Sequence, residues 1–292
     1  MKNQSIIPSL NFHLWQPCNM RCGFCFATFL DVKQSVLPKG HLSKEKAIEL
    51  MHCIGHSRLF QKINFAGGEP MLCPWLGVLV KIAKSYGLTT SIISNGSNLT
   101  SQWLKEMRPY LDWIGLSIDS IDENTNLVSG RAIVGKKVIT KTDYIGLCLK
   151  IKSFGYMLKI NTVVHQYNWQ ENFSGFISEI KPERWKVFQV LPIQNQNDGD
   201  VERFLISDNK FSSFIERHQF LSCLVPENNE AIKGSYLMID PAGRFFDNSN
   251  GKHCYSQPIL QTNIIDALKQ INPSFEKFMG RGGFYDWQNN TV

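Results

Sequence analysis

The feature that most restricts the fold of this chain is a regular alternation of short, β-prone apolar runs with longer segments of helical periodicity. The predicted strands are Asn11–Trp15, Lys62–Phe65, Thr89–Ser94, Trp113–Ile118, Met157–Val164 and Trp185–Val190. The predicted helices between them are Lys44–His56, Trp75–Tyr86, Gln102–Tyr110, Lys137–Phe154 and Trp169–Ile180. Alternation of this kind predicts parallel strands joined by right-handed crossovers. Six such units predict an α/β fold, a partial (βα)6 TIM-like barrel rather than a closed eight-fold one.

The alternation stops after Val190. Residues 191–292 are therefore predicted to form a C-terminal extension that packs on the barrel of residues 1–190, within a single domain overall. Its predicted parts are the polar stretch LPIQNQNDGD, a helix over Asp208–His218 with Ser207 as its N-cap, a strand in GSYLMID, a turn at Pro241-Ala242-Gly243 and a final helix around Thr262–Gln270.

Composition excludes disorder and gives little guidance about partners. Of 292 residues, 43 % are hydrophobic and 19 % are charged, which is the mix of an ordinary globular protein. The net charge of +6 suits an anionic small molecule as well as a nucleic acid. There is no apolar run of about 18 residues, and the N-terminal MKNQSIIPSLNFHLWQPC lacks a secretion signal or an amphipathic anchor. We therefore expect a cytoplasmic, monomeric protein with no membrane partner.

Three of the eight cysteines are clustered directly after the first predicted strand. In WQPCNMRCGFCFAT, three and then two residues separate Cys18, Cys22 and Cys25. Three thiolates this close suit one inorganic cluster. The lack of a fourth nearby cysteine leaves one iron open to an exogenous ligand, whereas a ferredoxin cluster takes four protein ligands and a structural zinc takes a closed shell. The alternatives are a Cys3His zinc site using His13 or His41, or a chance grouping of buried cysteines.

The remaining five cysteines are scattered and sit mostly among apolar neighbours. They are Cys53, Cys73, Cys148, Cys223 and Cys254. Small buried hydrophobic side chains are the simplest interpretation of each.

The spacing Cys-x3-Cys-x2-Cys, with an aromatic residue at Phe24, resembles the radical S-adenosylmethionine (SAM) superfamily. The resemblance implies a [4Fe–4S] cluster whose open iron is chelated by SAM, and cleavage of SAM to methionine and a 5′-deoxyadenosyl radical. Gly67-Gly68-Glu69-Pro70 follows the second strand and matches the loop that the superfamily uses for the SAM amino group. Its glycines permit close backbone approach, although a tight turn would explain the motif alone.

Four further residues lie where the ribose and carboxylate of SAM could be bound. Ser94 and Asn95 end the third predicted strand, Ser117 is on the fourth, and Arg131 follows it. Each of them singly is equally compatible with turn chemistry or with a solvated charge.

Polar and cationic side chains recur at inward positions of three predicted strands. With a period of two, the pairs that share a face are Lys62 and Asn64, Lys159 and Asn161, and Arg184 and Lys186. Barrel interiors are normally filled by Val, Ile and Leu, and burying an unpaired charge is strongly unfavourable. A polyanionic ligand such as a triphosphate is therefore predicted, unless these cations pair with Asp or Glu or the faces are assigned wrongly.

Longer tracts carry a narrower resemblance. In order along the chain they are CNMRCGFCF, KINFAGGEP, SNGS, SIDSIDE, LKIN, ERWKVFQV, ERFLIS, SCLVPE, SYLMID and RGGFYDW. Over Asn11–Trp287 the chain resembles the viperin family, in particular its short prokaryotic members. This implies a lyase that dehydrates a nucleoside triphosphate to its 3′-deoxy-3′,4′-didehydro analogue, a chain terminator in antiviral (phage) defence. In that reaction the radical removes the C4′ hydrogen and the 3′-hydroxyl leaves as water.

The resemblance also implies roles for individual residues. The triphosphate ligands would be Lys62, Lys159, Arg184 and Lys186, with Asn11, Asn64 and Asn161 near the sugar or base. Tyr236 would supply the final hydrogen or proton, and Arg281, with Lys252 as a weaker candidate, would close over the nucleotide. An electron donor of flavodoxin or ferredoxin type is implied. Ala27 and Ala66 depart from the animal pattern, so CTP, UTP and GTP all remain candidate substrates.

Two other functions remain possible from the sequence. Another radical SAM enzyme, acting on a nucleotide or a peptide, would commonly carry a second cluster, but only Cys223 and Cys254 lie in the C-terminal region. A non-catalytic iron–sulfur or zinc module that binds nucleic acid would need clustered surface cations and exposed aromatic residues. Because the cations recur at inward positions, we expect no nucleic-acid partner.

Overall fold

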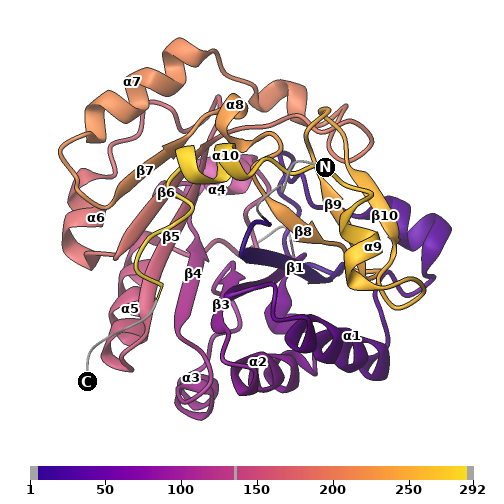
Figure 1. Ribbon diagram of the computed structural model, residues 1–292. Helices are drawn as coiled ribbons and strands as arrows, with labels where there is room; N and C mark the ends of the chain where they lie inside the picture. Colours follow the sequence, from indigo (N-terminus) through magenta and orange to yellow (C-terminus); the bar gives the residue numbers. More distant parts are fainter. Residues whose placement is uncertain (1–5, 135–136, 288–292) are drawn as a thin grey trace.

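The computed structural model describes residues 6–134 and 137–287, and its centre is a curved ten-stranded sheet (Figure 1). The strand order is β10-β9-β8-β1-β2-β3-β4-β5-β6-β7. The strands are β1 (Ser9–Trp15), β2 (Lys62–Gly67), β3 (Thr89–Ser94), β4 (Trp113–Ser117), β5 (Met157–Val164), β6 (Arg184–Gln189), β7 (Leu224–Glu227), β8 (Leu237–Ile239), β9 (Arg244–Asp247) and β10 (Cys254–Pro258). From β8 through β1 to β7 all pairs are parallel, which confirms the predicted α/β partial barrel.

Helices cover the outer face of the barrel (Figure 1). Those that follow β1 to β5 are α1 (Lys44–Ser57), α2 (Leu76–Ser85), α3 (Ser101–Met107), α4 (Glu123–Val128), α5 (Lys141–Ser153) and α6 (Ser174–Ile180). Single turns occur at Val32–Val36, Pro70–Leu72 and Val201–Phe204. The later helices are α7 (Asp208–His218), α8 (Asn229–Ile232), α9 (Ile264–Leu268) and α10 (Phe275–Gly280).

Two helices begin later than hydrophobic periodicity predicted. The helix predicted from Lys137 begins at Lys141, because Thr140 and Asp143 form a reciprocal capping box. The helix predicted from Trp169 begins at Ser174. The prediction of Thr262–Gln270 as the final helix is wrong, since α9 is only a short part of that range and α10 follows it, capped by Ser274.

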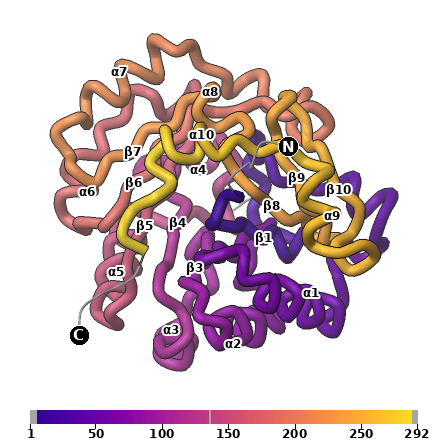
Figure 2. Tube along the Cα trace, in the orientation of Figure 1, coloured from indigo at the N-terminus to yellow at the C-terminus, as the bar shows by residue number. Residues whose placement is uncertain are grey.

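The C-terminal extension adds strands to both edges of the barrel. β7 pairs with β6, and β8 pairs with β1 on the opposite side. The predicted turn at residues 241–243 joins β8 to β9, and Gly243 takes a positive φ of 76° there. Figure 2 shows the yellow C-terminal segment running from α10 across the strands toward β5, and the indole Nε1 of Trp113 on β4 donates to the Trp287 carbonyl (3.0 Å).

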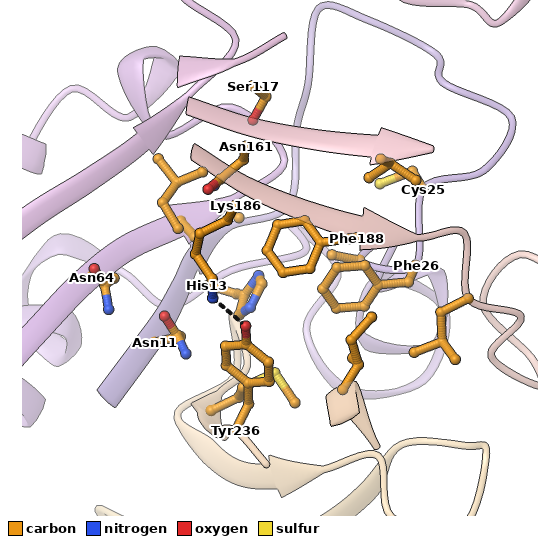
Figure 3. Close-up of a pocket in the computed structure, with 18 of the residues that line it drawn as sticks. Asn11, His13, Cys25, Phe26, Asn64, Ser117, Asn161, Lys186, Phe188 and Tyr236 are labelled. Carbon is orange, nitrogen blue, oxygen red and sulfur yellow. Dashed lines mark hydrogen bonds between the residues drawn. The ribbon is translucent and has the colours of Figure 1, made fainter. Parts of the chain in front are cut away.

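The two faces of the sheet differ as the alternation predicted. Ile63, Phe65, Ile160 and Val187 are fully buried in the apolar layer beneath the helices. Their neighbours Asn64, Asn161 and Lys186 face the barrel interior (Figure 3). The interior therefore holds polar groups where an ordinary barrel holds aliphatic ones.

None of the helices in the described ranges is both long and apolar enough to span a bilayer. Residues 1–5 lie outside the described residues. They belong to the N-terminal segment in which the sequence analysis found no secretion signal.

Candidate active site

A cavity of about 290 Å³ runs along the barrel interior, from the loops after the strands toward the strand beginnings. At one end it is lined by predicted cluster and SAM residues, namely Cys18, Cys22, Phe24, Cys25, Gly67, Gly68, Glu69, Ser94, Asn95, Ser117 and Arg131. Toward the other end it is lined by predicted nucleotide residues, namely Asn11, Asn64, Lys159, Asn161, Arg184, Lys186, Tyr236 and Arg281. Residues predicted for two ligands thus share one space.

The cysteine loop is held in place by backbone hydrogen bonds. Arg21 N donates to Gly130 O (3.0 Å) and Gly23 N donates to Ser129 O (3.1 Å). A Cβ at Gly130 would lie 2.0 Å from the Arg21 carbonyl oxygen, so glycine is needed for this approach. These hydrogen bonds therefore hold the loop on both sides of Cys22.

The donor set fits a cluster better than a single ion. All three thiols are free of disulfides and line the same cavity. Within residues 6–134 and 137–287, no three His, Cys, Asp or Glu side chains converge closely enough to hold one metal ion. His13 packs against Phe29 (5.2 Å between ring centroids) and lines the same cavity as the cysteines, whereas His41 stacks on Trp15 (3.8 Å). Three separate thiols with open space between them suit the corners of an iron–sulfur cluster.

The two glycines at the end of β2 pack the loop against the chain that leads into Cys18. Gly68 N donates to Trp15 O (2.5 Å), and Glu69 N donates to Pro17 O (3.0 Å). A Cβ on Gly67 would meet Trp15 O at 2.3 Å, and a Cβ on Gly68 would meet Gln16 O at the same distance. These glycines therefore set the position of the cysteine loop, whatever ligand their backbone also meets.

Glu69 links the end of β2 to the end of β3. Its Oε1 accepts from Ser94 Oγ (2.7 Å) and Met71 N (3.0 Å), and its Oε2 accepts from Asn95 N (2.7 Å). Burial raises the pKa of this carboxyl, and the hydrogen bonds oppose the shift. A contact between Glu69 and the SAM ammonium remains a prediction.

Arg131 is held by a buried carboxylate that the sequence reasoning missed. Asp119, two residues beyond Ser117, forms an ion pair with Arg131, and its Oδ1 accepts from Val163 N (2.8 Å). Arg131 also donates to Ser117 O (3.3 Å) and lies over the ring of Phe24. Asp119 could have been recognised from its position in the tract SIDSIDE at the end of a predicted strand, because barrel enzymes carry functional residues at strand ends.

The cationic end of the cavity holds Lys159, Arg184, Lys186 and Arg281, all at most about one-tenth exposed. Figure 3 shows the Lys186 ammonium reaching the Tyr236 hydroxyl (2.5 Å), near Asn11 and Asn64. The Oδ1 atoms of Asn64 and Asn161 are buried without a hydrogen-bond partner in the described part of the chain. Buried polar atoms are normally hydrogen-bonded, so these two amide oxygens can accept from a molecule bound in the cavity.

Glu227 is the second functional residue that the sequence reasoning missed. This carboxylate at the end of β7 is fully buried, its Oε1 lies 2.5 Å from Lys186 Nζ and 3.6 Å from an Arg281 nitrogen, and its Oε2 accepts from the Tyr236 hydroxyl. The alternative that the inward cations pair with acids therefore holds for Lys186 and Arg281. It does not hold for Lys159 and Arg184, which have no carboxylate within ion-pair distance among the described residues.

Two predicted residues lie outside the cavity lining. Lys62 is fully buried below it, where its ammonium contacts the Tyr285 hydroxyl and lies over the rings of Tyr285 (4.4 Å), Trp113 (5.0 Å) and Trp287 (5.5 Å). Lys252 is exposed on the loop before β10. Their roles in binding nucleotide remain predictions.

Comparisons with known proteins assign the chain to a family. Residues 15–173 match the family model of the radical SAM superfamily. A protein of Lacinutrix mariniflava named S-adenosylmethionine-dependent nucleotide dehydratase is 56 % identical over 286 residues. The match covers 98 % of this chain but only 60 % of the longer relative. A protein of the same name from Flammeovirga pacifica is 48 % identical over 288 residues, covering 99 % of each chain.

A solved structure shows the same fold. Native anSMEcpe with bound AdoMet and the Kp18Cys peptide is 14 % identical, with a TM-score of 0.69 over 92 % of this chain and 82 % of that one. The family-model match and the two close relatives carry the assignment further than this shared fold does. The chain belongs to the radical SAM superfamily and, within it, to the family of S-adenosylmethionine-dependent nucleotide dehydratases, the viperin family whose motifs it carries.

Proposed function

We propose that this protein removes water from the ribose of a nucleoside triphosphate and so makes a 3′-deoxy-3′,4′-didehydro nucleotide. The names of its relatives support a nucleotide as substrate. A triphosphate as the bound group is supported by four buried cations that face the same cavity as the three thiols. They are Lys159, Arg184, Lys186 and Arg281.

The charges of this cluster do not balance without a ligand. Among the described residues, one carboxylate, Glu227, lies within ion-pair distance of the four cations, so three positive charges are left over (four minus one). Each unpaired buried charge costs several kcal/mol in free energy. A triphosphate supplies enough negative charge to balance the surplus, whereas an uncharged nucleoside or a peptide backbone does not.

The residues at the other end of the cavity fit the cofactors of the family. Cys18, Cys22 and Cys25 would hold a [4Fe–4S] cluster, and the segment of Gly67-Gly68-Glu69, with Arg131, would hold SAM. When bound, these groups would supply the radical chemistry needed to abstract hydrogen from the substrate ribose. The chain's own part is to place the ribose: the open amide oxygens of Asn64 and Asn161 can accept hydrogen bonds from sugar hydroxyls.

Tyr236 is the proposed source of the final hydrogen or proton. Its hydroxyl lies at the cavity, accepts from Lys186 and donates to Glu227. Burial raises the pKa of Tyr236 well above its usual value, so the phenol stays protonated. An external one-electron donor of flavodoxin or ferredoxin type would complete the reduction, with the protein acting as a cytoplasmic monomer.

The deciding experiment is an anaerobic turnover with reconstituted protein, SAM, a strong reductant and CTP, UTP, GTP or ATP in separate tubes. Mass spectrometry follows 5′-deoxyadenosine and a nucleotide lighter by one water. Both products in step in one tube establish the reaction and identify the base. Equal traces of 5′-deoxyadenosine in all tubes, with no altered nucleotide, would refute it. The Cys22→Ala variant is the control and should cleave no SAM.

A radical SAM enzyme with a second cluster is the main rival. Cys223 precedes β7 and Cys254 begins β10, and these are the two terminal strands of the sheet. This placement supports a single cluster. An iron content of about four per chain is expected, and about eight would favour the rival. The role of the product as a chain terminator in antiviral defence is part of our proposal.

A further inference from the structure

Glu227 is the one acid that contacts the cation cluster in the part of the chain that the structure describes. A buried carboxylate beside a site for a polyanion is unexpected, because its charge opposes that of the ligand. Its contacts suggest what offsets this cost. It lies 2.5 Å from Lys186 Nζ, and it accepts from the hydroxyl of Tyr236, which itself contacts Lys186.

We propose that Glu227 is a positioning residue that keeps Lys186 protonated and aimed into the cavity, ready for a triphosphate oxygen. The inference rests on the proposed function, because it assigns Lys186 to the triphosphate. An ammonium group has three N–H donors. One is directed at Glu227 and one at the Tyr236 hydroxyl, which leaves the third for the nucleotide.

Among the described residues, the other charged groups that face Lys186 are positive. Lys159 projects from β5, Arg184 lies two residues earlier on β6, and Arg281 follows α10, with Lys62 on β2 below them. Tyr236 is neutral. Without Glu227, the Lys186 ammonium would be buried among like charges, and the neutral amine would be the more stable form.

The causes of the pKa shifts agree with this geometry. The pKa of Lys186 lies well below its usual value because of burial; Glu227 raises it, and Arg281 and Lys159 lower it further. Burial alone would raise the pKa of Glu227, but Lys186 and Arg281 outweigh that effect and lower it, so the carboxylate stays ionised. Glu227 therefore offers a permanent negative charge to Lys186.

The test is the pH dependence of anion binding in the Glu227→Gln variant, which keeps the shape of the side chain but not its charge. Calorimetry would measure the affinity of the full-length protein for inorganic triphosphate and for a nucleoside triphosphate between about pH 6.5 and 9.5. Since the protonated form of Lys186 binds the anion, affinity should fall as pH rises through the pKa of that residue. In Glu227→Gln this fall should begin about one pH unit lower than in the wild type, which makes binding about tenfold weaker in that interval.

A second substitution separates charge from shape. Arginine stays protonated throughout this range, so Glu227→Gln combined with Lys186→Arg should lose the early decline and keep only the decline that Lys159, with a pKa of about 8, contributes to every variant. Glu227→Asp, which retains the charge, should keep the wild-type profile. Thermal unfolding of each variant would confirm that the fold is intact.

Three results would overturn the inference. They are an unchanged profile in Glu227→Gln, a loss of affinity by the same factor at every pH, and an early decline that Lys186→Arg fails to remove. If Glu227→Gln does not fold, wild type and Lys186→Arg are compared alone. Matching profiles from about pH 7 to 8 support the proposal, and a decline confined to the wild type overturns it. Failure of the wild type to bind any triphosphate would instead refute the proposed function.

Discussion

Gly68 illustrates how much one missing side chain determines at the residue scale. Its backbone N–H bonds to Trp15 O, and a Cβ would lie 2.3 Å from Gln16 O and 2.4 Å from Pro17 O. Both carbonyls are backbone atoms just before Cys18, so neither can move aside without moving the cysteine loop. The spacing of the thiols therefore depends on a residue that carries none of the chemistry.

We predict that Gly68→Ala displaces the cysteine loop and lowers the iron bound after reconstitution to a small fraction of the wild-type amount. Iron analysis and the visible absorption of the cluster measure this directly. The matched control is Gly146→Ala in α5, where an added Cβ meets nothing within 4 Å. That change should leave iron content unaltered and stabilise the fold by about 0.5–1 kcal/mol. Full cluster loading in Gly68→Ala would contradict the prediction.

A second prediction concerns Lys159, which lies at the end of the cavity where we propose that the nucleotide binds. It is 4 % exposed and has no carboxylate within ion-pair distance among the described residues. Burial and the nearby Arg184 lower its pKa to about 8, so a bound anion should also stabilise its charge. Lys159→Gln should weaken nucleotide binding by about 1.5–3 kcal/mol, roughly 10- to 150-fold, and leave SAM binding nearly unchanged. Equal losses for both ligands, measured by calorimetry, would contradict this assignment.

The sequence allowed the clustered residues to be predicted, but not their isolated partners. Cysteine spacing and a glycine pair are local patterns, so Cys18, Cys22, Cys25 and the loop after β2 were recognisable. Glu227 is a lone acid in the apolar tract SCLVPE, and its pairing with Lys186 exists only because β6 and β7 lie side by side. Lys62 fits the inward pattern, yet the tail residues that enclose it come from the opposite end of the chain.

At the scale of elements, the capping box of α5 has an effect that can be isolated from catalysis. Thr140 Oγ1 accepts from Asp143 N (3.1 Å), and Asp143 Oδ2 accepts from Thr140 N (3.1 Å). Thr140→Ala should lower the free energy of unfolding by about 1 kcal/mol and leave turnover unchanged. Denaturant unfolding at neutral pH measures the loss, and Thr140→Ser, which can still cap, is the control.

The capping box also predicts how the difference in unfolding free energy between wild type and Thr140→Ala depends on pH. Its hydrogen bonds to Thr140 lower the pKa of Asp143 below its usual value. A lowered pKa stabilises the fold above the unfolded-state pKa and ceases to do so as pH falls through the folded-state value. The gap between wild type and Thr140→Ala should therefore narrow in acid. A gap of constant size down to low pH would argue against the Asp143 contribution.

Long elements were predictable and short edge elements were not. The six barrel strands carry enough apolar residues to be identified alone, and their bounds differ from the predictions by only a few residues. β7, β9 and β10 have four or five residues each, and β7 contains Pro226. Such segments become strands because a neighbour is present to pair with them, which no local pattern reveals.

At the scale of the whole molecule, the extension completes the sheet as well as the site. β7 and β8 cover the two outer edges of the barrel, and the extension also supplies Glu227, Tyr236 and Arg281. A fragment of residues 1–190 should therefore expose two unpaired strand edges and aggregate. Solubility and circular dichroism would test this against the full chain. Cooperative unfolding of the isolated fragment would show instead that the barrel is an independent domain.

The joining of β8 to β1 also imposes an order in time. A ribosome makes the chain from its N-terminus, so the cysteine loop leaves it early and Arg281 leaves it late. β1 has no partner on its β8 side until more than two hundred further residues have been added. The three thiols are thus synthesised well before the residues that close the cationic end of the cavity. On the proposed function, cluster insertion and nucleotide binding are for that reason separable events in the life of each molecule.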